Sequence, residues 1–369
     1  SCRALAARDA CDAIERLLDM PSAPSPALES AKPCREGIVQ GARYRLSFDP
    51  QRGEILGLYD KRTQQNLITS IFYRYDRYGI EDMTVYLRAY GYRFSDWGVL
   101  DNGRAQYPEC PHRTFLPAFR ECVRQGNTVT FRYATQANRQ DAGDAQEIEI
   151  SYTVPEDDTG VKVRISLSGK PATPYVESGE LVFRLANSNP RFWINKTGNV
   201  LDPQRDIAPG ANHAFYCLEN FAAAQADDAV LMVITRDCPL MSIGENGVYT
   251  FRREYQRNAP EMRFCLFNNM WGTNFPQWIQ GDFSFAFELR ALEKDDLDGA
   301  YAQACHALDD TPEISFPFSL PDCVRVTRLI PENGQLVLHL HNTSGAACQG
   351  ELYFPGHSLR REDLLGRPM

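Results

Sequence analysis

The sequence lacks the features that mark membrane proteins and nucleic-acid-binding proteins. No apolar run approaches the roughly 18 residues that a membrane-spanning helix needs, and no signal-peptide pattern opens the chain. The 39 basic and 48 acidic residues give a net charge of −9, whereas a nucleic-acid-binding protein presents a basic face. We therefore expect neither membrane nor nucleic acid as a partner.

Cysteine is present without the spacing of a disulfide framework or a zinc site. The 11 cysteines are odd in number and scattered, and no two of them form a C-x-x-C pair. Several stand in apolar segments, such as Cys217 in AFYCLEN and Cys265 in RFCLFNN. We predict reduced cysteines that act as small hydrophobic residues in a cytosolic protein.

Familiar catalytic motifs are also missing. The sequence has no phosphate loop, no dinucleotide fingerprint and no Ser-His-Asp context. Of the six histidines, only His339 and His341 are close, and two positions apart on a strand they would face the same side. No Asp or Cys within a few residues completes a ligand set for a metal. We expect solvated strand histidines and no cofactor in this chain.

The pattern that is present is alternation of apolar and polar residues from about residue 40 onward. ARYRLSFD, the turn PQRG and EILGLYD predict a hairpin. Further strands, with Gly, Asn, Asp and Pro between them, are predicted at 66–75, 128–135, 147–154, 160–168, 179–187, 213–218, 228–235, 261–268 and 282–290. Helical patterns occupy 79–92 and 293–309. This succession predicts a mainly β fold built around a large antiparallel sandwich.

Helical and proline-rich segments divide the chain into four parts. Residues 1–30 open with an apolar stripe and end in PSAPSP, and we expect them to be the tail of an upstream helical bundle. We expect such a helix to pack on the β-region or on a second copy of the chain, and the sequence therefore leaves open whether the chain forms a homo-oligomer. The large sandwich is expected over 35–292, a helix and linker over 293–321, and a small β-sandwich over 322–369.

Several stretches resemble a known family. YRLSFDPQRGEILGLYDKRTQQNLI, residues 44–68, resembles the hairpin that opens the β-domain of glycoside hydrolase family 38, the α-mannosidases. VRVTRLIPENGQLVLHLHNTSG resembles their terminal small sandwich. FWINKTGNVLDPQRDIAPGANHAFYCLEN, YGIEDM, DWGVLDNG and NNMWGTNFPQW resemble a bacterial branch of mannosidase-like proteins.

The resemblance implies a large sandwich of the galactose-mutarotase type, a small C-terminal β-sandwich and a cytoplasmic bacterial protein. In that family a zinc-bearing catalytic domain and a helical bundle precede this region. The zinc and the upstream catalytic domain of the same parent protein are therefore expected outside this chain. By itself the chain is expected to be non-catalytic, to bind carbohydrate and to shape the sugar site of the catalytic domain.

The loop between the strands at 261–268 and 282–290 is the first candidate sugar site. Aromatic rings offer flat apolar area to a pyranose face, amides match its hydroxyl groups, and loops on a rigid sandwich often carry such sites. The candidates are Asn269, Trp271, Asn274, Phe275 and Trp278. We expect the loop to project from one rim of the sandwich, with Trp271 or Trp278 partly exposed toward a concave surface and at least one ring and two amides in a shared cleft. The alternative is that both indoles seal the sandwich end while the amides bond to loop backbone.

Other segments supply further carbohydrate candidates, namely Trp97 and Asp101 in SDWGVLDNG, Lys196 in NKTGN, and Asn212 and His213 in PGANHAF. A capped turn that packs one tryptophan inward explains the first pair equally well. Two other functions remain open. One is a free-standing mutarotase-like sugar enzyme in which His213 works with a Glu or Asp as base and acid. The other is a carbohydrate-binding or purely structural module.

Overall fold

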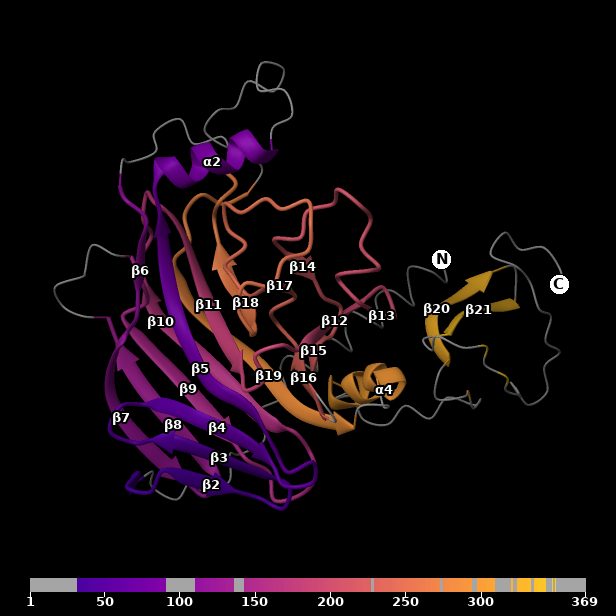
Figure 1. Cartoon of the computed structure of the whole chain (residues 1–369), viewed down its shortest axis with the longest axis horizontal. Coiled ribbons are helices and arrows are strands. Elements are labelled where there is room, and N and C mark those ends of the chain that lie inside the picture. Colours follow the sequence, from indigo (N-terminus) through magenta and orange to yellow (C-terminus); the bar gives the residue numbers. More distant parts are fainter. Residues whose placement is uncertain are drawn as a thin grey trace, which may run out of the picture.

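The protein is built from two large antiparallel sheets that face each other, as Figure 1 shows for the computed structural model. The structure describes residues 32–90, 110–135, 143–226, 229–272, 275–293, 297–308, 324–332 and 335–342, with the single residues 320, 347 and 349. The predicted mainly β fold with a large sandwich is confirmed. Neither helix in the described part of the chain is long and apolar enough to cross a membrane.

Sheet A has ten strands. In spatial order they are β1 (Lys32–Pro33), β7 (Ala118–Gln125), β8 (Thr128–Ala134), β9 (Glu147–Thr153), β10 (Val161–Lys170), β19 (Gly281–Glu293), β16 (Ala229–Thr235), β15 (Phe221–Ala226), β12 (Arg191–Lys196) and β13 (Asn199–Leu201). β19 is the long central strand, and it pairs with β10 on one side and β16 on the other.

Sheet B has nine strands. In spatial order they are β14 (Tyr216–Cys217), β17 (Leu240–Ile243), β18 (Glu261–Asn268), β11 (Val176–Leu185), β5 (Gln65–Tyr78), β4 (Glu54–Asp60), β3 (Tyr44–Asp49) and β2 (Ile38–Gln40), with β6 (Arg113–Phe115) paired to β5. A separate hairpin of β20 (Val324–Glu332) and β21 (Gln335–Asn342) follows near the end of the chain.

The core lies between the two sheets, because each strand turns alternate side chains inward. On β10, Val163, Ile165 and Leu167 are buried between polar neighbours. On β11, Leu181 and Phe183 meet them from sheet B, and one cluster contains residues of both sheets. The burial of alternate apolar residues fixes the register of these strands, since a shift by one residue would expose them.

The hairpin of β3 and β4 forms where the alternation predicted it. The Asp49 side chain accepts hydrogen bonds from the backbone N–H groups of Gln51, at 2.8 Å, and Arg52, at 3.1 Å, and so closes the turn. Gly53 follows with φ of 67°, a conformation that glycine adopts without strain.

In the described part of the chain, two helices accompany the sandwich. α2 (Ile80–Tyr90) lies across one end of it, and α4 (Leu297–Leu308) packs on the outer side of sheet A (Figure 1). Ala300 and Ala304 of α4 are fully buried there, against a cluster that includes Val230 and Met232 of β16. β16 is consequently buried on both faces, and its sequence is a nearly continuous apolar run that ends in Thr235.

Some sequence predictions differ from the structure or fall outside it. The segment 213–218 was expected to be a strand, but only Tyr216–Cys217 pairs, with Met241 and Leu240 of β17. The residues before it make turn contacts instead, since the Asn212 side chain bonds to backbone N–H groups. The predicted helix within 1–30, the linker around 310–321 and the last predicted strand of the small sandwich lie outside the described residues.

Candidate functional site

The end of the sandwich under α2 gathers a group of aromatic side chains, one of which, Trp271, is a candidate that the sequence singled out. β5 ends there at Tyr78, opposite Val176 where β11 begins, and the loops after β17 and β18 close over them. A buried cluster holds Tyr78, Met83, Tyr86, Leu87, Val176, Val248, Tyr249 and Met270, with Phe215, Phe251 and Trp271 packed against it. We call this group the end cluster.

Trp271 joins the loop between β18 and β19 to α2. Its ring centroid lies 5.8 Å from that of Tyr90 and 6.3 Å from that of Tyr86, both at nearly perpendicular angles. Edge-to-face pairs of this kind stabilise a contact beyond the apolar area that they bury. The indole of Trp271 is half-buried and therefore still presents part of its surface to solvent.

Two further rings of the same loop project outward. Phe275 is 64% exposed and Trp278 is 55% exposed. The expectation that at least one indole of this loop is exposed is confirmed, whereas the concave surface beside it and its contact with a sugar stay predictions. Large exposed rings that come from one loop are the kind of surface that binds a partner or a ligand.

Asn269 does not fit the direct sugar contact that the sequence suggested. The residue is buried, and its Nδ2 donates to the carbonyl oxygens of Tyr175, at 3.1 Å, and Gln277, at 2.8 Å. Its Oδ1 accepts from the backbone N–H of Glu177 at 2.8 Å. Both amide hydrogens therefore serve the backbone, and Asn269 acts as a clamp that holds the two ends of the loop together.

A buried ion pair secures the other side of this loop. Lys170 Nζ lies 2.6 Å from Glu177 Oε1, and both side chains are fully buried. The same ammonium donates to the carbonyl oxygen of Ile279, at 3.0 Å, and Glu177 accepts from the hydroxyl of Tyr75, at 2.6 Å. Burial raises the pKa of Glu177, although Lys170 opposes the shift. The loop with the exposed rings is thus tied to the sandwich core by charge-assisted bonds.

Asp144 is a second buried acid at this end. Its Oδ1 accepts from the hydroxyl of Tyr73 at 2.7 Å and from the backbone N–H of Ala145 at the same distance. Burial raises the pKa of Asp144 to about 7, although the bond from Tyr73 opposes the shift. Asp144 and Glu177 both lie on the core side of the sheets, where a sugar would have no access.

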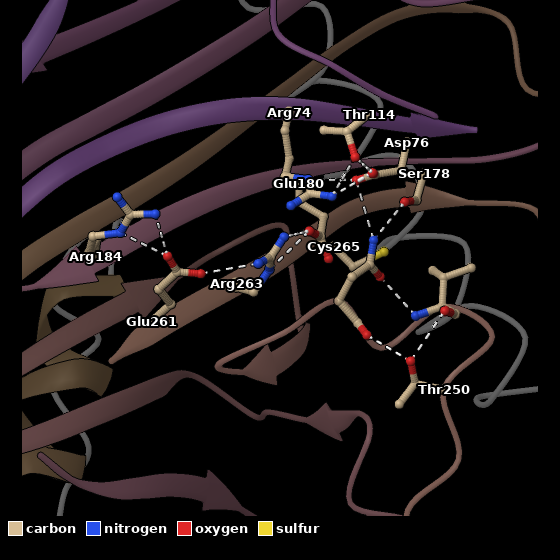
Figure 2. Close-up of polar contacts among 12 residues, drawn as sticks. Arg74, Asp76, Thr114, Ser178, Glu180, Arg184, Thr250, Glu261, Arg263 and Cys265 are labelled. Atoms are coloured by element: carbon tan, nitrogen blue, oxygen red, sulfur yellow. Dashed lines mark hydrogen bonds and ion pairs between the residues drawn. The ribbon is translucent and has the colours of Figure 1, made fainter. Parts of the chain in front are cut away.

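The opposite face of sheet B carries a chain of ion pairs, which Figure 2 shows running across β18, β11 and β5. Glu261 accepts from Arg184, at 2.8 Å, and from Arg263, at 3.1 Å, and Arg263 also reaches Glu180, at 2.7 Å. We call this the outer-face network. Its carboxylates are buried and paired with guanidinium groups, which holds the three strands in fixed positions.

The network continues to β5 and on to α2 through His112, which the sequence analysis did not select. Its Nε2 lies 3.3 Å from Asp76 Oδ1, and its Nδ1 lies 3.1 Å from Asp82 Oδ1. The centroid of its ring lies 4.9 Å from that of Tyr78, with the two rings tilted by 60°. Asp82 also accepts from the backbone N–H of Gly79 at 2.8 Å, as a capping residue of α2. His112 therefore links the helix to the sheet.

The two aspartates and the histidine shift one another's protonation. Hydrogen bonds to Asp76 and Asp82 raise the pKa of His112 to about 9. Burial alone would raise the pKa of Asp76, but bonds from His112 and Arg74 outweigh it and lower the pKa to about 2. His112 is consequently an imidazolium ion near neutral pH and donates from both ring nitrogens.

The remaining sequence candidates are dispersed. Lys196 is exposed at the end of β12. Asn212 is exposed and bonds to the backbone N–H groups of Ala214 and Arg252, and the His213 ring lies 3.2 Å from the hydroxyl of Tyr216. Trp97, Asp101 and Asn274 lie outside the described residues. The segment of Asn212 and His213 adjoins the end cluster through the neighbouring Phe215 and through hydrogen bonds to the backbone of Arg252, the residue after Phe251.

His339 and His341, the two histidines that are close in the sequence, both lie on β21. In the part of the chain that the structure describes, no group of three or more His, Cys, Asp or Glu side chains could hold a metal ion.

In comparisons with known proteins, this chain is similar in fold to part of two larger proteins of known structure. No protein-family model and no curated protein matches the sequence. An α-mannosidase from Enterococcus faecalis V583 is similar in structure, with a TM-score of 0.57 and 9% identity over 94% of this chain and 41% of its own. A glycosyl hydrolase family 38 protein from Enterococcus faecalis has a TM-score of 0.57 and 10% identity, over 94% of this chain and 43% of its own.

A galactose mutarotase-like protein from Lactobacillus casei ATCC 334 is more distant, with a TM-score of 0.38 and 14% identity over 71% of this chain and 100% of its own. At these identities the likeness to the two Enterococcus proteins concerns the fold alone. The chain also spans less than half the length of either of them.

Proposed function

We propose that this chain is the β-region of an α-mannosidase-like glycoside hydrolase, where it shapes a carbohydrate-binding site and does not catalyse hydrolysis by itself. One observation carries the proposal: the fold of nearly the whole chain matches part of an α-mannosidase, at a TM-score of 0.57 over 94% of the chain. The catalytic domain and its zinc would belong to the same parent protein.

The loop between β18 and β19 supports the carbohydrate part of the proposal. It offers the exposed rings of Phe275 and Trp278 and the half-buried indole of Trp271. Its ends are held by Asn269 and by the buried Lys170, so the rings are held in place before any ligand arrives. A rigid aromatic surface binds the apolar face of a sugar with little loss of conformational entropy.

The burial of four carboxylates near the candidate site supports a non-catalytic role. A retaining glycosidase uses two carboxyl groups roughly 5–5.5 Å apart that both reach the sugar. In the described residues of the outer-face network, Glu180 and Glu261 are buried and bonded to arginine, while Glu177 and Asp144 lie inside the sandwich. Groups in these positions hold strands and loops and have no path to a glycosidic bond.

A free-standing mutarotase-like enzyme is the weaker alternative. Among the described residues, no carboxylate lies within hydrogen-bond distance of the His213 ring, which bonds to Tyr216. His112 does have two carboxylate partners, but it is already protonated near neutral pH and cannot act as a base there.

Calorimetric titration of the chain with methyl α-mannoside and α-linked mannobiose tests the proposal. We expect binding that Trp278→Ala weakens by about tenfold, which corresponds to about 1.4 kcal/mol, a reasonable value for one stacked ring. Because Trp278 is mostly exposed, its removal should change the free energy of unfolding by less than about 0.5 kcal/mol.

The matched control is Leu56→Ala on β4, which removes a side chain of similar exposure away from the loop and should leave binding unchanged. A wild-type chain that binds neither sugar, or ring variants Trp278→Ala and Phe275→Ala that bind like the wild type, would contradict the proposed site.

A further inference from the structure

Two cysteines lie directly opposite each other at one edge of sheet A. β1 pairs with β7 in an antiparallel register that aligns Lys32 with Arg124 and Pro33 with Val123. The next step of this register places Cys34 opposite Cys122. The backbone confirms the alignment, because the N–H of Cys34 donates to the carbonyl oxygen of Cys122 at 3.0 Å.

The two thiols point to the same side of the sheet. Cys122 is buried in the core cluster, and the partly buried Cys34 packs against that cluster. Directly opposed residues of an antiparallel pair have Cα atoms about 4.5–5.5 Å apart, within the roughly 4.4–6.8 Å that a disulfide spans. The pair can therefore be bridged without moving the strands.

The environments of the two thiols differ in a way that sets the order of reaction. Cys34 is partly exposed, and its Sγ lies 3.1 Å from the carbonyl oxygen of Glu36. Burial, followed by contact with the Cys34 thiol, raises the pKa of Cys122 to about 12. A reagent in solution reaches Cys34 first, and Cys122 reacts only with a sulfur already delivered beside it.

We propose that Cys34 and Cys122 form a reversible disulfide that fastens β1 to β7 when a low-molecular-weight disulfide is the oxidant. The Cys34 thiolate attacks one sulfur of glutathione disulfide and releases one glutathione thiolate. The Cys122 thiolate then attacks the Cys34 sulfur of the mixed disulfide and releases the second. The protein loses two hydrogens, and one glutathione disulfide becomes two molecules of glutathione.

Another pair of neighbouring cysteines provides a matched control. Cys238 Sγ lies 3.2 Å from the carbonyl oxygen of Cys265, and both side chains are buried. Neither sulfur can be reached by a solution disulfide in the folded protein. We expect this pair to stay reduced under conditions that oxidise Cys34 and Cys122.

The experiment exposes the full reduced chain to glutathione disulfide, followed by intact mass measurement and peptide mapping. The wild type should yield a peptide that joins Cys34 to Cys122 and is two hydrogens lighter than the reduced pair. In Cys122→Ser the reaction should stop at a glutathione adduct on Cys34, and Cys34→Ser should prevent both products. Cys238→Ser should behave as the wild type.

Thermal unfolding gives a second readout. Oxidation should raise the Tm of the wild type by at least about 4 °C, because the bond closes a long loop, and should leave the Tm of Cys34→Ser unchanged. A wild type that shows no linked peptide, a linked peptide between other cysteines only, or a mixed disulfide on Cys34 that never resolves would overturn the proposal.

Discussion

Replacement of Lys170 by methionine tests how the sandwich holds the loop with the exposed rings. In the native protein the ammonium of Lys170 lies 2.6 Å from Glu177 and donates to the carbonyl oxygens of Pro171 and Ile279. Methionine has a similar length and no charge. The variant would therefore leave the Glu177 carboxylate fully buried with the Tyr75 hydroxyl but without its counter-ion.

We expect Lys170→Met to lower the free energy of unfolding by about 3–5 kcal/mol, the usual cost of removing one member of a buried ion pair. This is a large share of the roughly 5–15 kcal/mol by which a domain is stable. The loss should be smaller at low pH. Burial already raises the pKa of Glu177, and without Lys170 nothing comparable opposes that shift. A carboxyl whose folded pKa is raised stabilises the fold when protonated, and this contribution disappears as the pH rises through the folded pKa.

Urea unfolding followed by circular dichroism at pH 5 and pH 8 measures both effects. Adding Glu177→Gln to Lys170→Met should recover at least about 2 kcal/mol at pH 8, because the uncompensated charge is gone. Lys162→Met, an exposed lysine on the same strand, should cost less than about 0.5 kcal/mol. A loss below about 1 kcal/mol for Lys170→Met, or an equal loss at both pH values, would refute the reasoning.

Two other predictions concern titratable groups near the end cluster. Since the pKa of Asp144 is raised to about 7, the free energy of unfolding of the wild type should fall between pH 5 and 7 by up to about 1.4 kcal/mol per pH unit. In urea titrations Asp144→Asn should flatten that slope. An unchanged slope would rule out Asp144 as its source. Since the pKa of His112 is raised to about 9, the contribution of His112 to the free energy of unfolding should be complete below pH 6.5 and should be lost as the pH rises through 9. After allowance for the partial exposure of His112, the variant His112→Gln should lose about 1 kcal/mol of stability at pH 6 and little at pH 10. Hydrogen exchange in α2 should be faster in the variant at pH 6. Equal losses at both pH values would contradict the role of His112 as a link between α2 and the sheet.

The strands could be predicted because their signal is local. The alternation in residues 44–60 and the turn around Asp49 specify a hairpin without reference to the rest of the chain. The segment 213–218 failed because alternation alone does not supply a partner strand, and only two of its residues pair with β17. β16 gave no alternation because α4 covers its second face, a fact that only the tertiary structure contains.

The candidate site was harder to predict, since the same side chains serve different partners in different folds. The Asn269 amide has the composition of a sugar ligand, but its hydrogens bond to the carbonyl oxygens of Tyr175 and Gln277. His112 lies far along the chain from both Asp76 and Asp82, and the three meet only because β6 pairs with β5 while α2 folds back over them. No local pattern predicts such a contact.

The two faces of β5 have a consequence for how this protein can change over generations. Tyr73 and Tyr75 point inward to the buried acids, whereas Arg74 and Asp76 point outward into the outer-face network. Substitution at one of these positions disturbs one face only. Insertion or deletion of a single residue would exchange the faces and bring a guanidinium and a carboxylate into the core in place of two phenols. The length of β5 is therefore under stronger constraint than its composition, and variation in length belongs in the loops beyond its ends.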